Sequence, residues 1–292
     1  MIETRLLNYF LAIAREENMT KAANTLHISQ PALSKQMTDL EKQLGTKLFI
    51  RGNKNTKLTE DGALFRSRAQ EIIKLIEKTE ADISSEATDI SGDIYLGCGE
   101  SHVMDYIVGI FETLHKEYPD VHFHIYSGNA ESVLERLDKG LLDAGLLLGS
   151  LNNEKYDLKD LGLYDRFGLL MTNSCPLAQK EYITSEDLQN LPILMPQQSI
   201  TSSKSLDEFV QALFQMKHTI NVVGTYNLLY NAIFMVEHNI GSAICIEGLV
   251  DTNSRNNLVF KPLLPEVRLN SYIVTKRYQS FSKAMKLFLD RL

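Results

Sequence analysis

A short segment near the N-terminus carries side chains that suit hydrogen bonding to DNA bases. Ser29 is a helix-capping residue, and it is followed by Gln30, Pro31, Ser34 and Lys35. These residues occupy the first turns of a predicted helix, where proline is tolerated because its missing N–H would be unpaired anyway. Glutamine pairs with two atoms of an adenine edge, serine bonds to several base edges, and lysine attracts phosphate. These side chains would suit a helix that presents its first turns to a DNA major groove.

Neighbouring segments must position that helix. Residues 4–16 place apolar side chains at the i, i+3, i+4, i+7 spacing of one helix face. Thr20 can cap a second, short helix that breaks near His27. The helix that opens at Gln30 ends before Gly45, a residue that suits a C-cap. Two short helices joined by a tight turn form a helix-turn-helix, in which Thr20 is a predicted phosphate contact.

A predicted wing and a long helix follow. Residues 48–50 and 57–58 flank the polar stretch RGNKNT, which predicts two short strands joined by a turn. Arg51 and Lys54 belong to this wing and are predicted to contact phosphate or the minor groove. Residues 59 to about 85 carry an uninterrupted apolar stripe at helical spacing, which predicts one long helix with few other elements to pack against it. A protruding helix with an apolar stripe usually pairs with a helix of a second chain.

The charge of the chain is unevenly distributed. The net charge of −7 over 292 residues counts by itself against binding to nucleic acid. Residues 1–60, however, hold nine Lys/Arg and six Asp/Glu, whereas the remainder holds 21 and 31. A basic head on an acidic body suits a chain that contacts phosphate at one end only.

Beyond the SerGly pair at 91–92 the pattern changes to alternating strands and helices. This alternation predicts an α/β fold built mostly from parallel sheets. The predicted strands are 94–98, 121–126, 143–148, 167–172, 192–195, 220–224, 242–246 and 270–275, and the predicted helices are 105–117, 130–139, 204–216, 226–238 and 280–291.

The stretch from residue 22 to residue 62 resembles the DNA-binding signature of LysR-type transcriptional regulators. The resemblance lies in the paired alanines, SQPALS, LE three residues before LG, LF, an Arg, LT and a Gly. It implies an N-terminal all-α winged helix-turn-helix with a long linker helix, and a C-terminal α/β effector domain of two lobes, similar to periplasmic solute-binding proteins. The family positions carried over to this chain are Gln30, Pro31, Ser34 and Arg51.

The resemblance extends over the rest of the chain. EYPDV at 117–121, LDKGLLDAGL at 137–146 and CPLA at 175–178 match family stretches, although Cys175 stands where the family commonly has His. The resemblance implies that the partner is double-stranded DNA and that two chains pair through the linker helix to bind it. It also implies a second contact, between effector domains, which would give a tetramer. The expected division is 1–58 for the DNA-binding domain, 59–89 for the linker, and 90–292 for the effector domain, with lobe one at about 91–162 plus 268–292 and lobe two at about 163–267.

Loops at the carboxyl ends of strands predict where an effector binds, because helix N-termini there point backbone N–H groups at a ligand. Hydroxyl and amide side chains dominate these loops and favour a small polar or anionic metabolite. The alternative is that residues such as Ser101, Asn129, Ser203 and Asn227 are helix caps only. The predicted effector contacts are Ser101, His102, Asn129, Gln197, Ser199, Thr201, Ser202 and Tyr226.

Other classes of function find little support. The sequence lacks a nucleophile elbow, a P-loop, a dinucleotide fingerprint and HExxH, so neither an enzyme nor a cofactor is expected. An oxidant sensor would use Cys98 and Cys245, but both belong to predicted interior strands, where a thiol is usually inert. His122 and His124 share a strand face without a third ligand nearby, so no metal site is expected. No signal sequence or membrane span is apparent, so we expect a cytoplasmic protein. The same observation counts against a stand-alone solute-binding protein, which would be exported.

Overall fold

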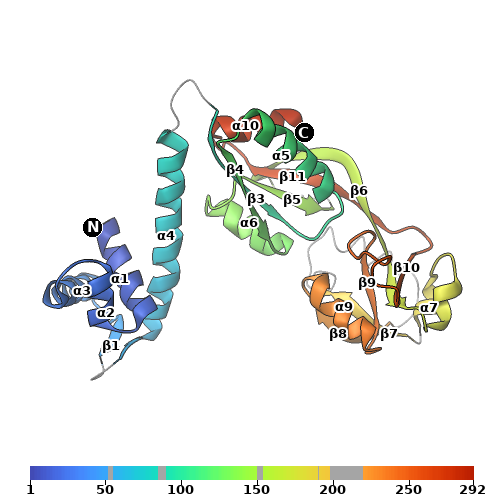
Figure 1. Ribbon diagram of the computed structural model, residues 1–292, viewed down its shortest axis with the longest axis horizontal. Helices are drawn as coiled ribbons and strands as arrows, with labels where there is room; N and C mark the ends of the chain where they lie inside the picture. The colour runs from blue at the N-terminus through green and yellow to red at the C-terminus, as the bar shows by residue number, and fades with distance from the viewer. Residues whose placement is uncertain (52–54, 85–89, 150–153, 190, 198–219) are drawn as a thin grey trace. The chain divides into compact units, whose positions relative to one another are not determined.

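The computed structural model describes the chain except for residues 52–54, 85–89, 150–153, 190 and 198–219. It divides into two compact units, Met1–Ser84 and Ser85–Leu292. Figure 1 shows a helical first unit that includes one long helix, and a second unit of strands and helices. None of the described helices is both long enough and apolar enough to cross a membrane.

In the described part of the first unit, four helices pack with a two-stranded wing. Phe10 is fully buried at its centre, with its ring centroid 5.1 Å from that of Phe49 and 4.8 Å from that of Phe65. One core therefore joins the first helix, the wing and the long helix. The elements are α1 (Thr4–Glu16), α2 (Met19–Thr25), α3 (Gln30–Leu44), β1 (Phe49–Arg51), antiparallel β2 (Thr56–Leu58) and α4 (Glu60–Ser84).

Capping residues explain where these helices begin and end. The side chain of Ser29 accepts a hydrogen bond from the backbone of α3, and Gly45 ends that helix with φ of 72°. The prediction that Thr20 caps α2 is wrong: the side chain of Asn18 accepts from the backbone N–H of Thr20 at 2.9 Å. The cap precedes the expected position because α2 begins at Met19, which leaves Thr20 exposed in the first turn.

The long helix α4 has one face in the core of the first unit and another outside it. Ala69 is fully buried, and Ile73 packs against the same core. Leu64, Ile72 and Leu75 are 61%, 45% and 42% exposed. A helix of 25 residues with exposed aliphatic side chains retains an apolar surface that this unit does not cover.

The second unit has two connected sheets that share one long strand. The order of neighbouring strands is β4-β3-β5-β11-β6-β9-β7-β8, and β10 also pairs with β6. The elements are β3 (Gly92–Cys98), α5 (Met104–Glu117), β4 (Val121–Ser127), α6 (Ala130–Asp138), β5 (Ala144–Leu148), β6 (Tyr156–Thr172), a 3-10 turn (Pro176–Gln179), α7 (Ser185–Leu188), β7 (Pro192–Pro196), β8 (Asn221–Tyr226), α9 (Leu229–Glu237), β9 (Ser242–Ile246), β10 (Leu258–Pro262), β11 (Arg268–Lys276) and α10 (Lys283–Arg291).

The sheets are mixed, so the prediction of mostly parallel sheets is wrong. Strand β3 is parallel to β4 and β5, and β7 is parallel to β8 and β9. Strand β6, however, is antiparallel to β9, β10 and β11. The chain crosses between the lobes in β6 and returns in β11, and two such crossings run in opposite directions. The first half of β6 and the whole of β10 had not been predicted from the sequence; the predicted helix 204–216 lies outside the described residues.

Separate cores fill the two lobes. Helices α5 and α10 pack on one face of the first sheet around Phe111 and Phe288, and α6 packs on the other face around Val133 (Figure 1). In the second lobe, α9 packs around Ile233, and another cluster surrounds Ile193. Strands β6 and β11, which pair with each other, connect the two lobes.

Candidate functional site

The predicted DNA-contacting residues lie on the outer face of the first turns of α3. Gln30, Pro31 and Lys35 are exposed and Ser34 is half-buried. On the opposite face Leu33, like Met37 and Leu40 further along, is buried in the core. The core therefore fixes the helix and leaves its N-terminal polar face open to solvent.

Two more predicted contacts lie in other elements of this unit, and one lies outside the described residues. Thr20 is exposed at the start of α2. The backbone of Arg51 ends β1 opposite Thr56, which places the residue at the base of the wing. Lys54 lies outside the described residues.

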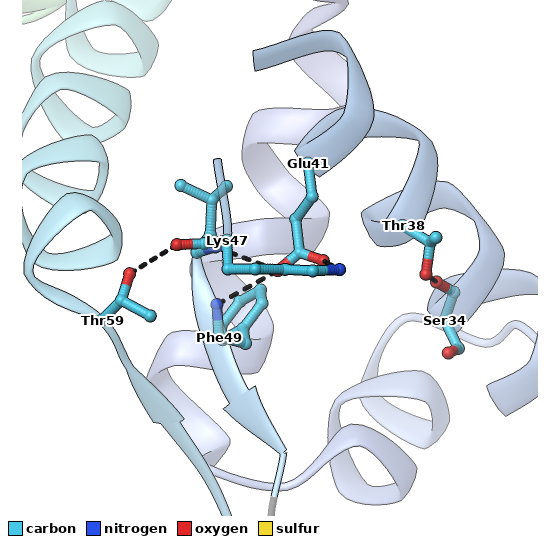
Figure 2. A network of polar contacts seen from close by, with 7 residues as sticks. Ser34, Thr38, Glu41, Lys47, Phe49 and Thr59 are labelled. Carbon is cyan, nitrogen blue, oxygen red and sulfur yellow. Dashed lines mark hydrogen bonds and ion pairs between the residues drawn. The ribbon is translucent and has the colours of Figure 1, made fainter. Parts of the chain in front are cut away.

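A buried carboxylate, which sequence reasoning had not singled out, connects α3 to the wing. Glu41 is 2% exposed, and its Oε1 accepts hydrogen bonds from the backbone N–H groups of Leu48 at 2.9 Å and Phe49 at 3.2 Å. Lys47 donates to its other oxygen at 3.0 Å (Figure 2). Burial raises the pKa of Glu41, but the hydrogen bonds from Lys47 and the two N–H groups outweigh it and hold the pKa below its ordinary value.

The start of α4 fits closely against the same segment. Thr59 Oγ1 donates to the carbonyl of Lys47 at 2.7 Å (Figure 2) and accepts from the N–H of Gly62 at 2.9 Å. A Cβ atom at Gly62 would lie 2.1 Å from the carbonyl oxygen of Leu48. Only glycine leaves room for this approach, which gives a physical reason for the Gly that closes the sequence signature.

In the second unit a cavity of about 100 Å³ lies where the two lobes meet. Two of the predicted effector contacts, Ser101 and Tyr226, belong to its lining. The wall is otherwise mostly apolar. The described lining residues are Gly99, Glu100, Ser101, Ala130, Leu146, Leu147, Leu148, Phe167, Pro196, Tyr226, Asn227, Leu229, Cys245, Ile246, Leu249 and Leu269.

Ser101 connects the loop after β3 to the crossing strand β6. Its hydroxyl donates to Asp165 at 2.6 Å and accepts from the N–H of Val103 at 3.1 Å. Asp165 is 1% exposed and also accepts from the N–H of His102 at 2.9 Å. Burial raises the pKa of Asp165, against the opposing effect of these hydrogen bonds. Asp165 is a residue that sequence reasoning did not identify.

Glu100 contacts the other lobe. Its carboxylate accepts a hydrogen bond from the N–H of Leu229 at 2.5 Å and another from the N–H of Tyr230. It therefore caps α9 from across the cavity, and burial raises its pKa. Asn227, an expected cap of α9, instead accepts from the N–H of Leu228, because α9 begins at Leu229 and Asn227 therefore lies one residue before the N-cap position.

The remaining predicted effector contacts are not in the described lining of this cavity. Asn129 caps α6 by accepting from the N–H of Ser132 at 2.9 Å. His102 and Gln197 are exposed, and the ring of His102 lies against Gly248. Three further predicted contacts, Ser199, Thr201 and Ser202, lie outside the described residues, as does the alternative cap Ser203.

Tyr226, in contrast, lies at the cavity as the last residue of β8. Its hydroxyl donates to the carbonyl of Ile244, and burial raises its pKa well above the ordinary value. The phenol is thus a neutral part of the wall.

Two family models account for most of the chain. The model described as bacterial regulatory helix-turn-helix protein, lysR family, matches residues 4–63, and the LysR substrate binding domain matches residues 87–292. The chain belongs to the LysR family of DNA-binding transcriptional regulators. These regulators are not enzymes.

Known LysR proteins resemble this chain along most of its length. The regulator CysL of Bacillus subtilis is 31% identical over 186 residues, which are 63% of this chain and 62% of CysL, so this match spans less than two thirds of the relative. The uncharacterized regulator YvbU of the same organism is 26% identical over 97% of this chain and 95% of its own. The crystal structure of full-length CbnR with its target DNA is 17% identical, covers 99% of this chain and 98% of CbnR, and has a TM-score of 0.77, which shows the shared fold.

Two thiols of this LysR protein lie in surroundings that disfavour the thiolate form. Cys98 and Cys245 are both buried, in the separate strands β3 and β9, and burial raises the pKa of each thiol. A raised pKa disfavours the reactive thiolate.

The paired histidines contact one carboxylate. His122 Nδ1 and His124 Nε2 lie 3.6 and 3.2 Å from the same oxygen of Asp93. Within the described part of the chain, no group of three or more His, Cys, Asp or Glu residues is arranged to hold a metal ion.

Proposed function

We propose that this LysR regulator reads a specific DNA sequence with the N-terminal face of α3. The observation that carries the proposal is the polar face of exposed Gln30, Pro31 and Lys35 with half-buried Ser34, set against a fully buried opposite face. Gln30 and Ser34 are one helical turn apart and supply base-edge hydrogen bonds, and Pro31 contacts thymine methyl groups. Lys35 adds a positive charge beside them.

Contacts to the DNA backbone fix the register of this helix. In the proposal, exposed Thr20 and the wing residues Arg51 and Lys54 bind phosphate or the minor groove. Glu41 supports their placement because it joins the recognition helix to β1 by hydrogen bonds to two backbone N–H groups. The functional division is then 1–58 for DNA binding, 59–89 for the linker and 90–292 for the effector.

The proposed regulator is a homodimer that pairs through α4. Exposed Leu64, Ile72 and Leu75 supply the apolar surface that a second copy of the helix would cover. Pairing sets two recognition helices to read half-sites that are about one DNA turn or a multiple apart. Contacts between effector domains would complete a tetramer in the cytoplasm, where the DNA is.

The proposed effector is a small molecule that binds between the lobes, in the cavity lined by Ser101 and Tyr226. Its lining is more apolar than the strand-end loops had suggested, and it favours an apolar effector body over an anionic one. A ligand that prefers one arrangement of the lobes shifts the equilibrium by its differential affinity, and the linker helices transmit the shift to the DNA-binding units.

Selection from a random DNA pool tests the DNA-binding proposal. The full-length chain should enrich a two-fold symmetric sequence, whereas the Gln30→Ala variant should enrich it weakly or not at all. Gln43→Ala is the matched control, because Gln43 is also exposed on α3 but lies at its C-terminal end. Enrichment that is equally strong in the Gln30→Ala variant would contradict the assigned reading role.

A thermal-shift screen of small metabolites tests the effector proposal. A ligand at about 100 times its dissociation constant stabilises the folded state by about 2.7 kcal/mol. Ala130→Trp, which places a large side chain in the cavity wall, should abolish the shift. A ligand response that survives this substitution would place the effector elsewhere.

A further inference from the structure

The cavity between the lobes combines an apolar wall with one carboxylate. Leucine, isoleucine, phenylalanine and proline make up most of the lining, and Glu100 is the one described lining residue with a carboxyl side chain. An isolated carboxylate in an apolar wall is costly to desolvate unless partners compensate it. The chemistry of this cavity therefore depends on what compensates Glu100.

Part of the compensation comes from α9. Glu100 accepts from the N–H groups of Leu229 and Tyr230, and it faces the positive end of the dipole of a nine-residue helix. The carboxylate thus already occupies the helix N-terminus, which is the position that an anionic effector would otherwise use. A second anion in this cavity would meet Glu100 without an additional described cation, and like charges at short distance repel.

We propose that the cavity takes a small, mainly apolar ligand that carries a protonated amine, with the ammonium group bound to the carboxylate of Glu100. The inference rests on the proposed function, in which the effector occupies this cavity. A carboxylate has about four lone-pair positions, and two hydrogen bonds to α9 leave others for an ammonium donor. The apolar body of the ligand contacts side chains such as Leu147, Phe167 and Leu269.

The proposal also gives the ligand a way to act on the lobes. Glu100 follows β3 in one lobe, whereas Leu229 begins α9 in the other. An ammonium group on Glu100 either competes with the N–H groups of α9 for the carboxylate oxygens or adds a hydrogen bond to those that Glu100 already accepts from α9. In either case the ligand acts on the hydrogen bond that joins the two lobes at this point.

Three probes with one carbon skeleton test the charge preference. Isobutylamine, isobutanol and isobutyrate differ in whether the polar end is positive, neutral or negative, and their size suits a cavity of about 100 Å³. Binding to the full-length protein at neutral pH would be measured by calorimetry and by ligand-observed NMR. We expect isobutylamine to bind at least about tenfold more tightly than isobutyrate, since a charge-assisted hydrogen bond is gained in one case and repulsion in the other.

Two variants assign the preference to Glu100. Glu100→Gln keeps an oxygen that can accept from Leu229 but removes the charge, so isobutylamine should lose about tenfold in affinity and isobutyrate should lose nothing. Glu131→Gln is the matched control, because Glu131 is an exposed carboxylate in the first turn of α6, next to the cavity residue Ala130. It should leave all three affinities unchanged.

The outcomes separate this inference from the proposed function. Isobutyrate binding as tightly as isobutylamine, or no measurable binding of the amine at millimolar concentration, overturns the amine proposal without requiring any variant to fold. If isobutyrate binds as tightly as isobutylamine and Ala130→Trp removes that binding, the cavity remains the effector site and only its charge preference is wrong. If the amine binds equally well to Ala130→Trp, both the charge assignment and the effector site fail.

Discussion

Replacing Glu41 by alanine should destabilise the DNA-binding unit far more than replacing its ion-pair partner Lys47. The side chain of Glu41 is 2% exposed, whereas that of Lys47 is 70% exposed. Alanine at position 41 leaves the N–H groups of Leu48 and Phe49 without this acceptor, and an unsatisfied buried donor costs about 1–3 kcal/mol. We expect a loss of about 2–5 kcal/mol for Glu41→Ala and about 0–1 kcal/mol for Lys47→Ala.

Glu41→Gln separates the charge from the acceptor. Both N–H groups bind the same oxygen of Glu41, which glutamine can supply, so this variant should lose only about 1–2 kcal/mol. The pKa of Glu41 is lowered in the folded state, so its contribution is complete above the unfolded pKa of about 4.3 and is lost as the pH falls through the folded value. The stability difference between wild type and Glu41→Gln should therefore shrink below about pH 4.

Hydrogen exchange of residues 4–58 in the full-length chain is the assay, because it reports opening of the first unit separately from the second. The expected order of destabilisation is Glu41→Ala, then Glu41→Gln, then Lys47→Ala. If Lys47→Ala were as damaging as Glu41→Ala, the surface ion pair and not the backbone hydrogen bonds would connect α3 to the wing.

Three further predictions follow from single contacts. Gly62→Ala should destabilise the first unit by about 1–3 kcal/mol, measured by hydrogen exchange, because the added Cβ would clash with the carbonyl oxygen of Leu48. Gly109→Ala is the control: this glycine lies in the middle of α5 with open space around it, so alanine should stabilise the second unit by about 0.5–1 kcal/mol. Asn18→Ala should cost about 0.5–2 kcal/mol through loss of the α2 cap. Ile72→Asp should split the dimer in light scattering, and an unchanged molar mass and DNA affinity would exclude α4 as the contact.

Local sequence rules predicted the first unit well because its elements carry strong local signals. Ser29, Pro31 and Gly45 mark the bounds of α3, and an uninterrupted apolar stripe marks α4. Thr20 was misassigned as a cap because Asn18 is equally suitable and lies two residues earlier, so composition alone does not choose between them.

Contacts between distant residues escaped prediction for a physical reason. The hydrogen bonds of Ser101 with Asp165 and of Glu100 with Leu229 join residues 64 and 129 positions apart, and no periodicity encodes such pairs. The sequence offered helix capping and ligand binding as alternative roles for the polar residues at strand ends, and it could not choose between them; Asn129 proves to be a cap of α6. The apolar wall of the cavity is formed by residues from several strands, so no single segment of the sequence could predict it.

The most direct test of the account is a mobility-shift titration of the full-length chain on its selected DNA site and on a scrambled version of that site. Gln30→Ala should weaken binding to the selected site by about 1–3 kcal/mol and leave binding to scrambled DNA nearly unchanged, since it removes hydrogen bonds to a base edge. Gln43→Ala should change neither. Equal losses on both DNAs for Gln30→Ala, or no loss on either, would contradict the claim that the N-terminal face of α3 reads the sequence.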